Sequence, residues 1–212
     1  MFIDLVFPKN NEKEFIEIAE KLKNHSLCFV YKFRNRNDFL QNQEKINKLQ
    51  EKTEIKLFTG LIADSKNISK AKKLAKLVIY KSTGNDRHAI EKSKVNVVFD
   101  LETIATKDSM HHRNSGLNHV LCRLANKNNI MIGFSFSTIL NTEGIIRSQI
   151  LGRLMQNIRL CRKYNVKTII ASFAEKPYDL RSYPDLKSVF ISTGMHPKEA
   201  KDSLESIYKQ LS

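Results

Sequence analysis

The stretch HHRNSGLNHVL, residues 111–121, gathers side chains that could bind a metal, transfer a proton or hold an anion. Imidazole rings ligate metals and titrate near neutral pH. Arginine and asparagine donate hydrogen bonds to phosphate oxygens or to backbone carbonyls. The question is whether this stretch is a catalytic site or a surface on which a negatively charged partner docks.

The spacing of the histidines gives little support to a metal site. Neighbouring residues of an extended chain point to opposite sides, so His111 and His112 are poorly placed to chelate one ion. His119 falls too far along a later helix to complete a compact set. Metal-dependent hydrolases built on barrels commonly carry an H-x-H pair on the first strand, whereas the first predicted strand here, 2–7, carries only Asp4. We therefore expect neither a metal site nor a bound cofactor.

Nucleophilic and acid–base catalysis are supported no better. The sequence has no G-x-S-x-G motif and no glycine-rich phosphate loop. Asp100 and Glu102 could share one face of an extended chain and act as acid and base, or one of them could pair with a local arginine. The three cysteines lie in apolar contexts, which predicts buried, reduced thiols: Cys28, Cys122 and Cys161. We assign no catalytic residue.

Charge is the most informative property of the composition. The chain has 36 Lys+Arg against 22 Asp+Glu, a formal net charge of +14. Such an excess attracts polyanions through counterion release and favours a nucleic-acid partner, the alternative being an ordinary lysine-rich surface. No apolar run approaches the ~18 residues of a membrane span, and the opening MFIDLVFP lacks the basic region of a signal peptide. We expect a cytoplasmic protein without membrane contact.

Apolar runs and helical patterns alternate from end to end. The predicted strands are 2–7, 27–33, 55–63, 77–80, 95–100, 130–136 and 167–172, with an eighth candidate at Thr106–Met110. Strands separated by helices favour parallel βαβ units. We expect a single α/β domain over residues 1–212, a TIM-barrel-like barrel of parallel strands with outer helices, with an open doubly wound sheet as the alternative.

Several basic residues fall at the mouth of this predicted fold or on the helix expected over 147–164. Arg147 lies at the N-terminus of that helix, where a cation opposes the helix dipole and needs a carboxylate, a carbonyl or a bound anion. Arg153 falls on the solvent side of the helical wheel. Lys81, Arg87 and Arg181 belong to the segments that follow strands or line the mouth. These positions favour a docking surface rather than bond-breaking machinery.

The 111–121 stretch fits the same interpretation. Gly116 permits a tight turn before the following helix, which Ser115 or Asn118 would cap. Histidines in such a loop can stack on bases or on the surface of a partner. Arg113 can donate to phosphate oxygens.

Three segments carry a family resemblance: HHRNSGLNHVLCRLANKNNIMIGFSFSTIL, RSQILGRLMQNIRLCRKYNVKTIIASFA and DLRSYPDLKSVFISTGM. In order and spacing they are similar to protein component 3 of archaeal ribonuclease P, the counterpart of the eukaryotic thirty-kilodalton subunit. The H-R-N-S-G-L-N core at 112–118 is specific, and the βα pattern agrees over essentially the whole chain. Residues 1–95 match in pattern rather than in motif.

The resemblance implies a TIM-barrel-like fold and an accessory role in ribonuclease P, which removes the 5′ leader of precursor tRNA. In that family the RNA subunit performs the Mg²⁺-assisted hydrolysis. The protein pairs with protein component 2, alongside the other protein subunits, and the two brace the catalytic domain of the RNA. Carried over onto this chain, the motif implies contacts with RNA or partner at His112, Arg113, Asn114, Asn118, Arg147 and Arg181. Position adds Lys81, Arg87 and Arg153.

Two rival functions remain open at this point. One is a free-standing metal-dependent phosphoesterase or nuclease that uses Asp4, Asp100 and a histidine. The other is a purely structural partner without RNA contacts, in which the charge is incidental.

Overall fold

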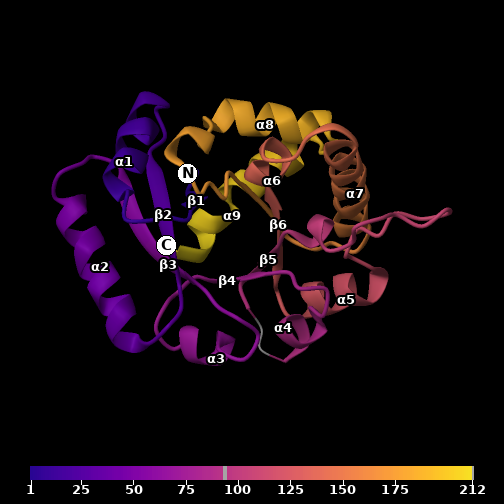
Figure 1. The fold of residues 1–212 in the computed structure, drawn as a ribbon, viewed down its shortest axis with the longest axis horizontal. Helices are drawn as coiled ribbons and strands as arrows, with labels where there is room; N and C mark the ends of the chain where they lie inside the picture. The colour runs from indigo at the N-terminus through magenta and orange to yellow at the C-terminus, as the bar shows by residue number, and fades with distance from the viewer. Residues whose placement is uncertain (93–94, 212) are drawn as a thin grey trace.

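The strands form one parallel sheet in which each strand pairs with the next along the chain (Figure 1). The computed structural model describes residues 1–92 and 95–211. The strands are β1 (Asp4–Val6), β2 (Ser26–Lys32), β3 (Lys56–Ile62), β4 (Val78–Lys81), β5 (Val97–Phe99), β6 (Met131–Ser135) and β7 (Thr168–Ala171). All seven well-marked strand predictions are confirmed.

The sheet curls until its two edges nearly meet. Val6 bridges in parallel to Ala174, which follows β7, and the amide of Phe7 donates to the carbonyl of Ala174 over 2.8 Å. The barrel is therefore nearly closed with seven strands. The eighth predicted strand, Thr106–Met110, is wrong, because these residues belong to a projecting loop without strand pairing.

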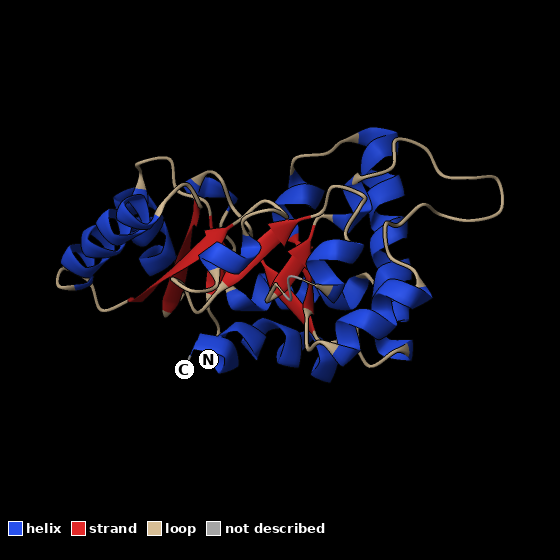
Figure 2. Cartoon of the chain, turned by 90° about the horizontal axis from the view of Figure 1, so that it is seen from below, coloured by secondary structure: helices blue, strands red, loops and turns tan. Residues whose placement is uncertain are grey.

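Helices surround the strands on the outside (Figures 1 and 2). They are α1 (Glu12–Lys21), α2 (Arg36–Gln50), α3 (Ile68–Ala71), α4 (Arg87–Glu91), α5 (His119–Lys127), α6 (Phe136–Leu140), α7 (Gly144–Lys163), α8 (Tyr183–Ser192) and α9 (Pro197–Leu211), with the short 3-10 helices η1 (Leu101–Thr103) and η2 (Pro177–Asp179). Within the described residues, none of these helices has the length and apolarity needed to cross a membrane.

The barrel interior is filled by aliphatic and aromatic side chains from alternating strand positions. At the carboxyl ends of the strands, Phe99 and Phe173 stack with ring centroids 4.5 Å apart. At the other end α9 closes the barrel, since Ile207 and Leu211 join the interior cluster and Lys76, just before β4, donates to the carbonyl of Leu211. Interior packing therefore fixes where the strand ends lie.

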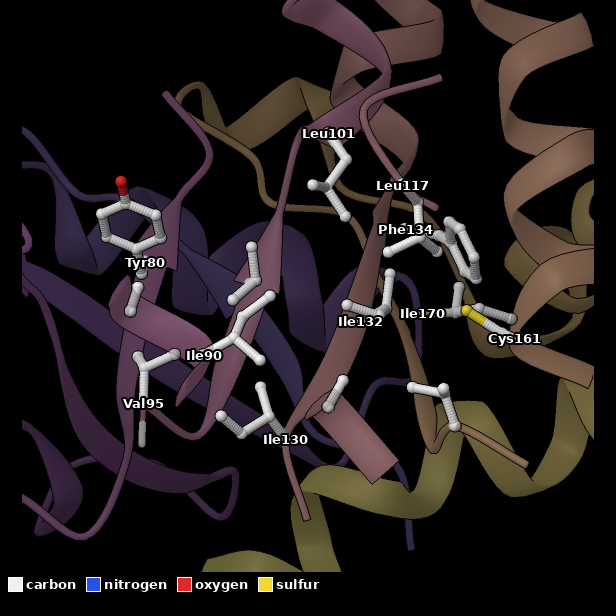
Figure 3. Close-up of a cluster of buried hydrophobic side chains, with 14 of the residues drawn as sticks. Tyr80, Ile90, Val95, Leu101, Leu117, Ile130, Ile132, Phe134, Cys161 and Ile170 are labelled. Atoms are coloured by element: carbon white, nitrogen blue, oxygen red, sulfur yellow. The ribbon is translucent and has the colours of Figure 1, made fainter. Parts of the chain in front are cut away.

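A larger apolar layer lies between the strands and the helices (Figure 3). Ile132, Phe134 and Ile170 point outward from the sheet and meet Leu117 and Cys161. All three cysteines are free and buried, as their apolar contexts predicted. This layer holds α7 firmly against the sheet, and α7 in turn positions the loop described next.

Candidate nucleic-acid interface

Residues 104–118, here called the 104–118 loop, connect η1 to α5 and project from the body of the protein (Figures 1 and 2). The loop carries few apolar side chains. One of them, Met110, is 93% exposed. The position of the loop therefore depends on polar contacts at its base rather than on hydrophobic burial.

Arg153 of α7 is the main anchor of this base. Its Nε donates to the Asp108 carboxylate over 2.7 Å, and its Nη1 donates to the carbonyls of Glu102 and Ala105. The residue is only 2% exposed. The helical-wheel prediction that Arg153 faces solvent is wrong, because the loop folds over this side of α7. Its guanidinium is thus a structural group inside the protein.

Two neighbours on α7 extend the anchor. Asn157 donates to the carboxylate of Glu102 over 2.8 Å and to the carbonyl of Ser115 over 2.9 Å. Gln156 donates to the hydroxyl of Ser115 over 2.9 Å and to the carbonyl of Arg113. Burial raises the pKa of Glu102 to about 7, and the hydrogen bond from Asn157 opposes that rise. Both ends of the loop are therefore fastened to one helix.

The loop also closes on itself. The Asn114 amide donates to Asp108 over 2.9 Å, and the Asn114 side chain donates to the carbonyl of Lys107 over 2.8 Å. A tight turn forms at the tip, where the amide of Ser109 donates to the carbonyl of His112. Burial raises the pKa of Asp108, but the hydrogen bonds from Arg153 and Asn114 outweigh it and lower that pKa overall.

Two glycines permit close approaches that no other residue allows. Gly116 has φ +75°, and a Cβ there would lie 2.3 Å from the carbonyl oxygen of Leu101. Gly152 of α7 leaves room for the Arg113 side chain, because a Cβ there would lie 2.8 Å from its Nε. Asn118 caps α5 and accepts from the amides of the first turn, which confirms one of the two predicted caps.

The outcome is a braced loop whose tip faces solvent. His111, His112 and Arg113 are exposed. Within the described part of the chain, the Arg113 guanidinium has no hydrogen bond or ion pair of its own, although it lies against Gly152. The protein thus holds imidazole and guanidinium groups outward at a fixed place, free to meet an external ligand.

The other predicted contact residues are mostly engaged within the protein. Lys81 pairs with Asp100 over 3.1 Å, and Arg87 pairs with Glu91 one helical turn away over 2.8 Å. The remaining two bond to backbone. Arg147 donates to the carbonyls of Leu140 and Thr142, and Arg181 donates to those of Tyr178 and Leu180 while its guanidinium lies 5.1 Å from the Phe136 ring.

The bonds of Arg147 answer the question its position raised. The backbone carbonyls of the preceding turn compensate a cation at a helix N-terminus. Of the three expected compensations, the carbonyl is the one found. These engaged residues keep their predicted role as contacts untested, yet each has a structural role that explains its presence.

The carboxylates of the rival phosphoesterase are also engaged. Asp4 accepts from the amides of Leu5 and Ser172, and burial raises its pKa to about 7. Asp100 accepts from the Thr138 hydroxyl over 2.6 Å and pairs with Lys81, not with an arginine. Among the residues the structure describes, no group of three or more His, Cys, Asp or Glu side chains is placed to hold a metal ion.

Comparison with known proteins decides the family. The family model described as RNase P subunit p30 matches residues 1–211. This chain belongs to that family. Ribonuclease P protein component 3 of Methanocaldococcus jannaschii is 27% identical over 93% of this chain and 85% of its own length. The protein of the same name from Thermococcus kodakarensis is 38% identical over 43% of this chain and 42% of its own length.

Solved structures confirm the fold. A chain from a cryo-EM structure of archaeal ribonuclease P with mature tRNA superposes with a TM-score of 0.79 at 23% identity, over 98% of this chain and 89% of the other. A crystal structure of an uncharacterized protein gives a TM-score of 0.59 at 8% identity, over 99% and 73% of the two chains. The TIM-barrel-like prediction is therefore correct, and the ribonuclease P subunit is a barrel of parallel strands.

The residues that brace the loop were not found from the sequence. Glu102 was considered only as a catalytic carboxylate, and neither Asp108 nor Asn157 was singled out. A buried arginine in the middle of a helix gives no local signal, because the same spacing fits a solvated face. The exposed apolar residues Ile145 (78% exposed) and Ile146 (61% exposed) were also missed.

Proposed function

We propose that this ribonuclease P subunit is an accessory protein that binds the ribonuclease P RNA and braces its catalytic fold. The RNA cleaves the 5′ leader from precursor tRNA with its own Mg²⁺, and the polypeptide supplies contacts rather than chemistry. Family membership over residues 1–211 supports the assignment to ribonuclease P. The net charge of +14 supports an RNA partner.

The observation that carries this proposal is the braced 104–118 loop. Arg153 and Asn157 hold the loop rigid, and the loop presents Arg113 with His111 and His112 to solvent. An arginine fork donates in pairs to phosphate oxygens, and imidazoles stack on unpaired bases. Because the loop is already ordered, binding RNA costs little conformational entropy.

Electrostatics explains how such a subunit helps a ribozyme. Each phosphate that the protein neutralises releases counterions and reduces repulsion between RNA segments. A folded RNA held in this way needs less Mg²⁺ to stay folded. Binding should therefore weaken steeply as salt rises, and the benefit of the protein should be greatest at limiting Mg²⁺.

Exposed apolar groups near the loop support a protein partner as well. Met110 lies at the loop tip, and Ile145 lies on the same face of α7 as Gly152, about two turns away. Such groups are costly to leave in water and are typical of contact surfaces. The partner that fits the family is the second small subunit, protein component 2, in the same ribonucleoprotein.

The experiment is a comparison of Arg113→Ala with Arg159→Ala. Both variants remove one exposed arginine, the first beside the loop and the second from the outer face of α7. We expect Arg113→Ala to weaken binding of ribonuclease P RNA in a gel shift and to raise the Mg²⁺ needed for reconstituted cleavage of precursor tRNA. Arg159→Ala should change both much less.

Equal effects of the two variants would reject the loop as the contact surface. Cleavage of precursor tRNA by the purified protein alone, lost in Asp100→Asn, would reject the accessory role itself.

A further inference from the structure

The carboxyl ends of the strands surround a cavity that the proposed function does not use. The cavity has a volume of about 480 Å³ and lies where β4, β5 and β6 end. Phe7, which is only partly buried, lines it and packs against the stacked rings of Phe99 and Phe173, with ring centroids 5.9 and 6.2 Å away. The cavity thus offers one accessible aromatic side chain.

Polar groups without partners line the same cavity. Ser137 is 7% exposed, and its hydroxyl has no hydrogen-bond partner among the described residues. The same holds for Oδ2 of Asp179, also a lining residue. Buried polar atoms are almost always paired, so two unpaired ones at one cavity point to a ligand that completes them.

Backbone strain is found at this cavity too. Asp100 has φ 60° and Phe173 has φ 50°, and neither is a glycine. Both residues line the cavity at the ends of neighbouring elements. Left-handed conformations of such residues cost free energy and concentrate at binding sites.

A second hollow of about 590 Å³ adjoins the first and shares Phe7 and Ile62 with it. Its lining includes Lys32 and Arg34, both exposed and without a hydrogen bond or ion pair in the described chain. Lys9, also in this lining, is paired with Glu175 over 2.9 Å. The mouth therefore has a polar, aromatic side and a side with two free cations.

We propose that the barrel mouth binds one unpaired nucleotide of an RNA strand. The base lies in the first cavity against Phe7, and its N–H groups and ring acceptors pair with Asp179 and Ser137. The phosphodiester lies in the second hollow on Lys32 and Arg34. The inference deepens the proposed RNA-binding function and rests on it.

The charges favour this orientation over the reverse. The first cavity is lined by two lysines and three carboxylates, namely Lys81, Lys176, Asp100, Glu175 and Asp179, so it repels a phosphate but accepts a neutral base. Base stacking on an aromatic side chain is tolerant of sequence, because every base has an aromatic face. The site would therefore select unpaired structure rather than sequence.

The test uses the full-length protein and two labelled oligomers of equal length and charge. One is an unstructured oligoribonucleotide, and the other is its abasic counterpart. We expect the protein to prefer the first by about fivefold to a hundredfold. Phe7→Leu keeps the apolar packing but removes the ring, so it should abolish the preference and leave the affinity for the abasic oligomer unchanged.

Phe58→Leu is the matched control, because Phe58 packs on the same interior cluster but precedes the end of β3 by four residues. It should retain the preference. Lys32→Gln and Arg34→Gln should weaken binding of both oligomers and reduce the dependence on salt by about one counterion each.

The inference is overturned if the wild-type protein binds the two oligomers equally, or if Phe7→Leu keeps the preference. It is also overturned if the preference is lost in His112→Ala instead, since the loop would then be what reads the base. In each case the binding of ribonuclease P RNA by wild type and Arg113→Ala still reports separately on the proposed function.

Discussion

The barrel interior and the 104–118 loop are held in place by opposite kinds of contact. Inside the barrel, Ile79, Val97 and Ile169 are fully buried among other apolar side chains. The loop has no such core and depends on Arg153 and Asn157, which fasten it through hydrogen bonds.

The difference concerns how each region responds to change. Apolar packing is spread over many residues, so a single substitution is partly absorbed by its neighbours. A polar anchor is concentrated, and removing one partner leaves the other buried and unpaired. The loop should therefore fail locally and sharply, while the barrel should weaken gradually.

Arg153→Ala is the change that should separate the two regions most. It leaves the Asp108 carboxylate and two carbonyls without their donor, and we expect a loss of about 3–5 kcal/mol in the free energy of unfolding. Denaturant unfolding measures this loss. Hydrogen exchange should show faster opening in residues 104–115 than in the strands, whereas equal acceleration in both would contradict a local anchor.

Acidity should act through Glu102, whose pKa burial raises from 4.5 to about 7. The native carboxyl keeps its proton between these values while the unfolded one loses it. The free energy of unfolding should therefore fall by about 3 kcal/mol from pH 4.5 to 7 on account of this group, and stay level above that.

Glu102→Gln keeps an acceptor for Asn157 and removes the titration. The fall with pH should then shrink, leaving the part that belongs to Asp4, whose pKa is also raised to about 7. Glu51→Gln, an exposed control, should leave the profile unchanged. An identical profile for Glu102→Gln and wild type would show that Glu102 is already ionised in the native protein.

Gly116→Ala tests the close approach that starts α5. The substitution adds left-handed strain and a clash with the Leu101 carbonyl, and we expect a loss of roughly 2 kcal/mol or more. Gly144→Ala carries similar strain at φ 53° with open space around it, so it isolates the clash. Thermal unfolding of the pair measures the difference, and equal losses would argue against the clash.

The smallest effect on stability is expected at Arg113. Its guanidinium is exposed, so Arg113→Ala should change the free energy of unfolding by less than about 0.5 kcal/mol. A larger loss in denaturant unfolding would mean that Arg113 is part of the anchor, and its effect on RNA binding would then need the same explanation as that of Arg153.

The sequence was sufficient for the barrel because strand patterns are local. Runs such as LCFVYKF (27–33) and IMIGFSF (130–136) are apolar on both faces, which is typical of parallel strands buried on both sides. Their order then predicts the sheet. The false eighth strand arose because Thr106–Met110 lies between η1 and α5, where an eight-stranded barrel would need one.

The site was less predictable because its roles depend on distant contacts. Arg113 and Arg153 have the same side chain, and their spacing gives no sign that one is exposed and the other buried. The difference comes from the loop folding over α7, which joins residues 45 positions apart in the Arg153–Asp108 pair. Likewise, the motif at 112–118 was recognisable, but Ser115 and Gly116 prove to be structural.

The central claim is that the braced loop, rather than the engaged basic residues, meets the RNA. Photo-crosslinking of the reconstituted ribonuclease P holoenzyme at physiological salt, followed by mass spectrometry of the crosslinked peptides, tests it most directly. We predict adducts on the peptide that contains His111, His112 and Arg113. Adducts confined to other surfaces, or none to this subunit at all, would contradict the claim.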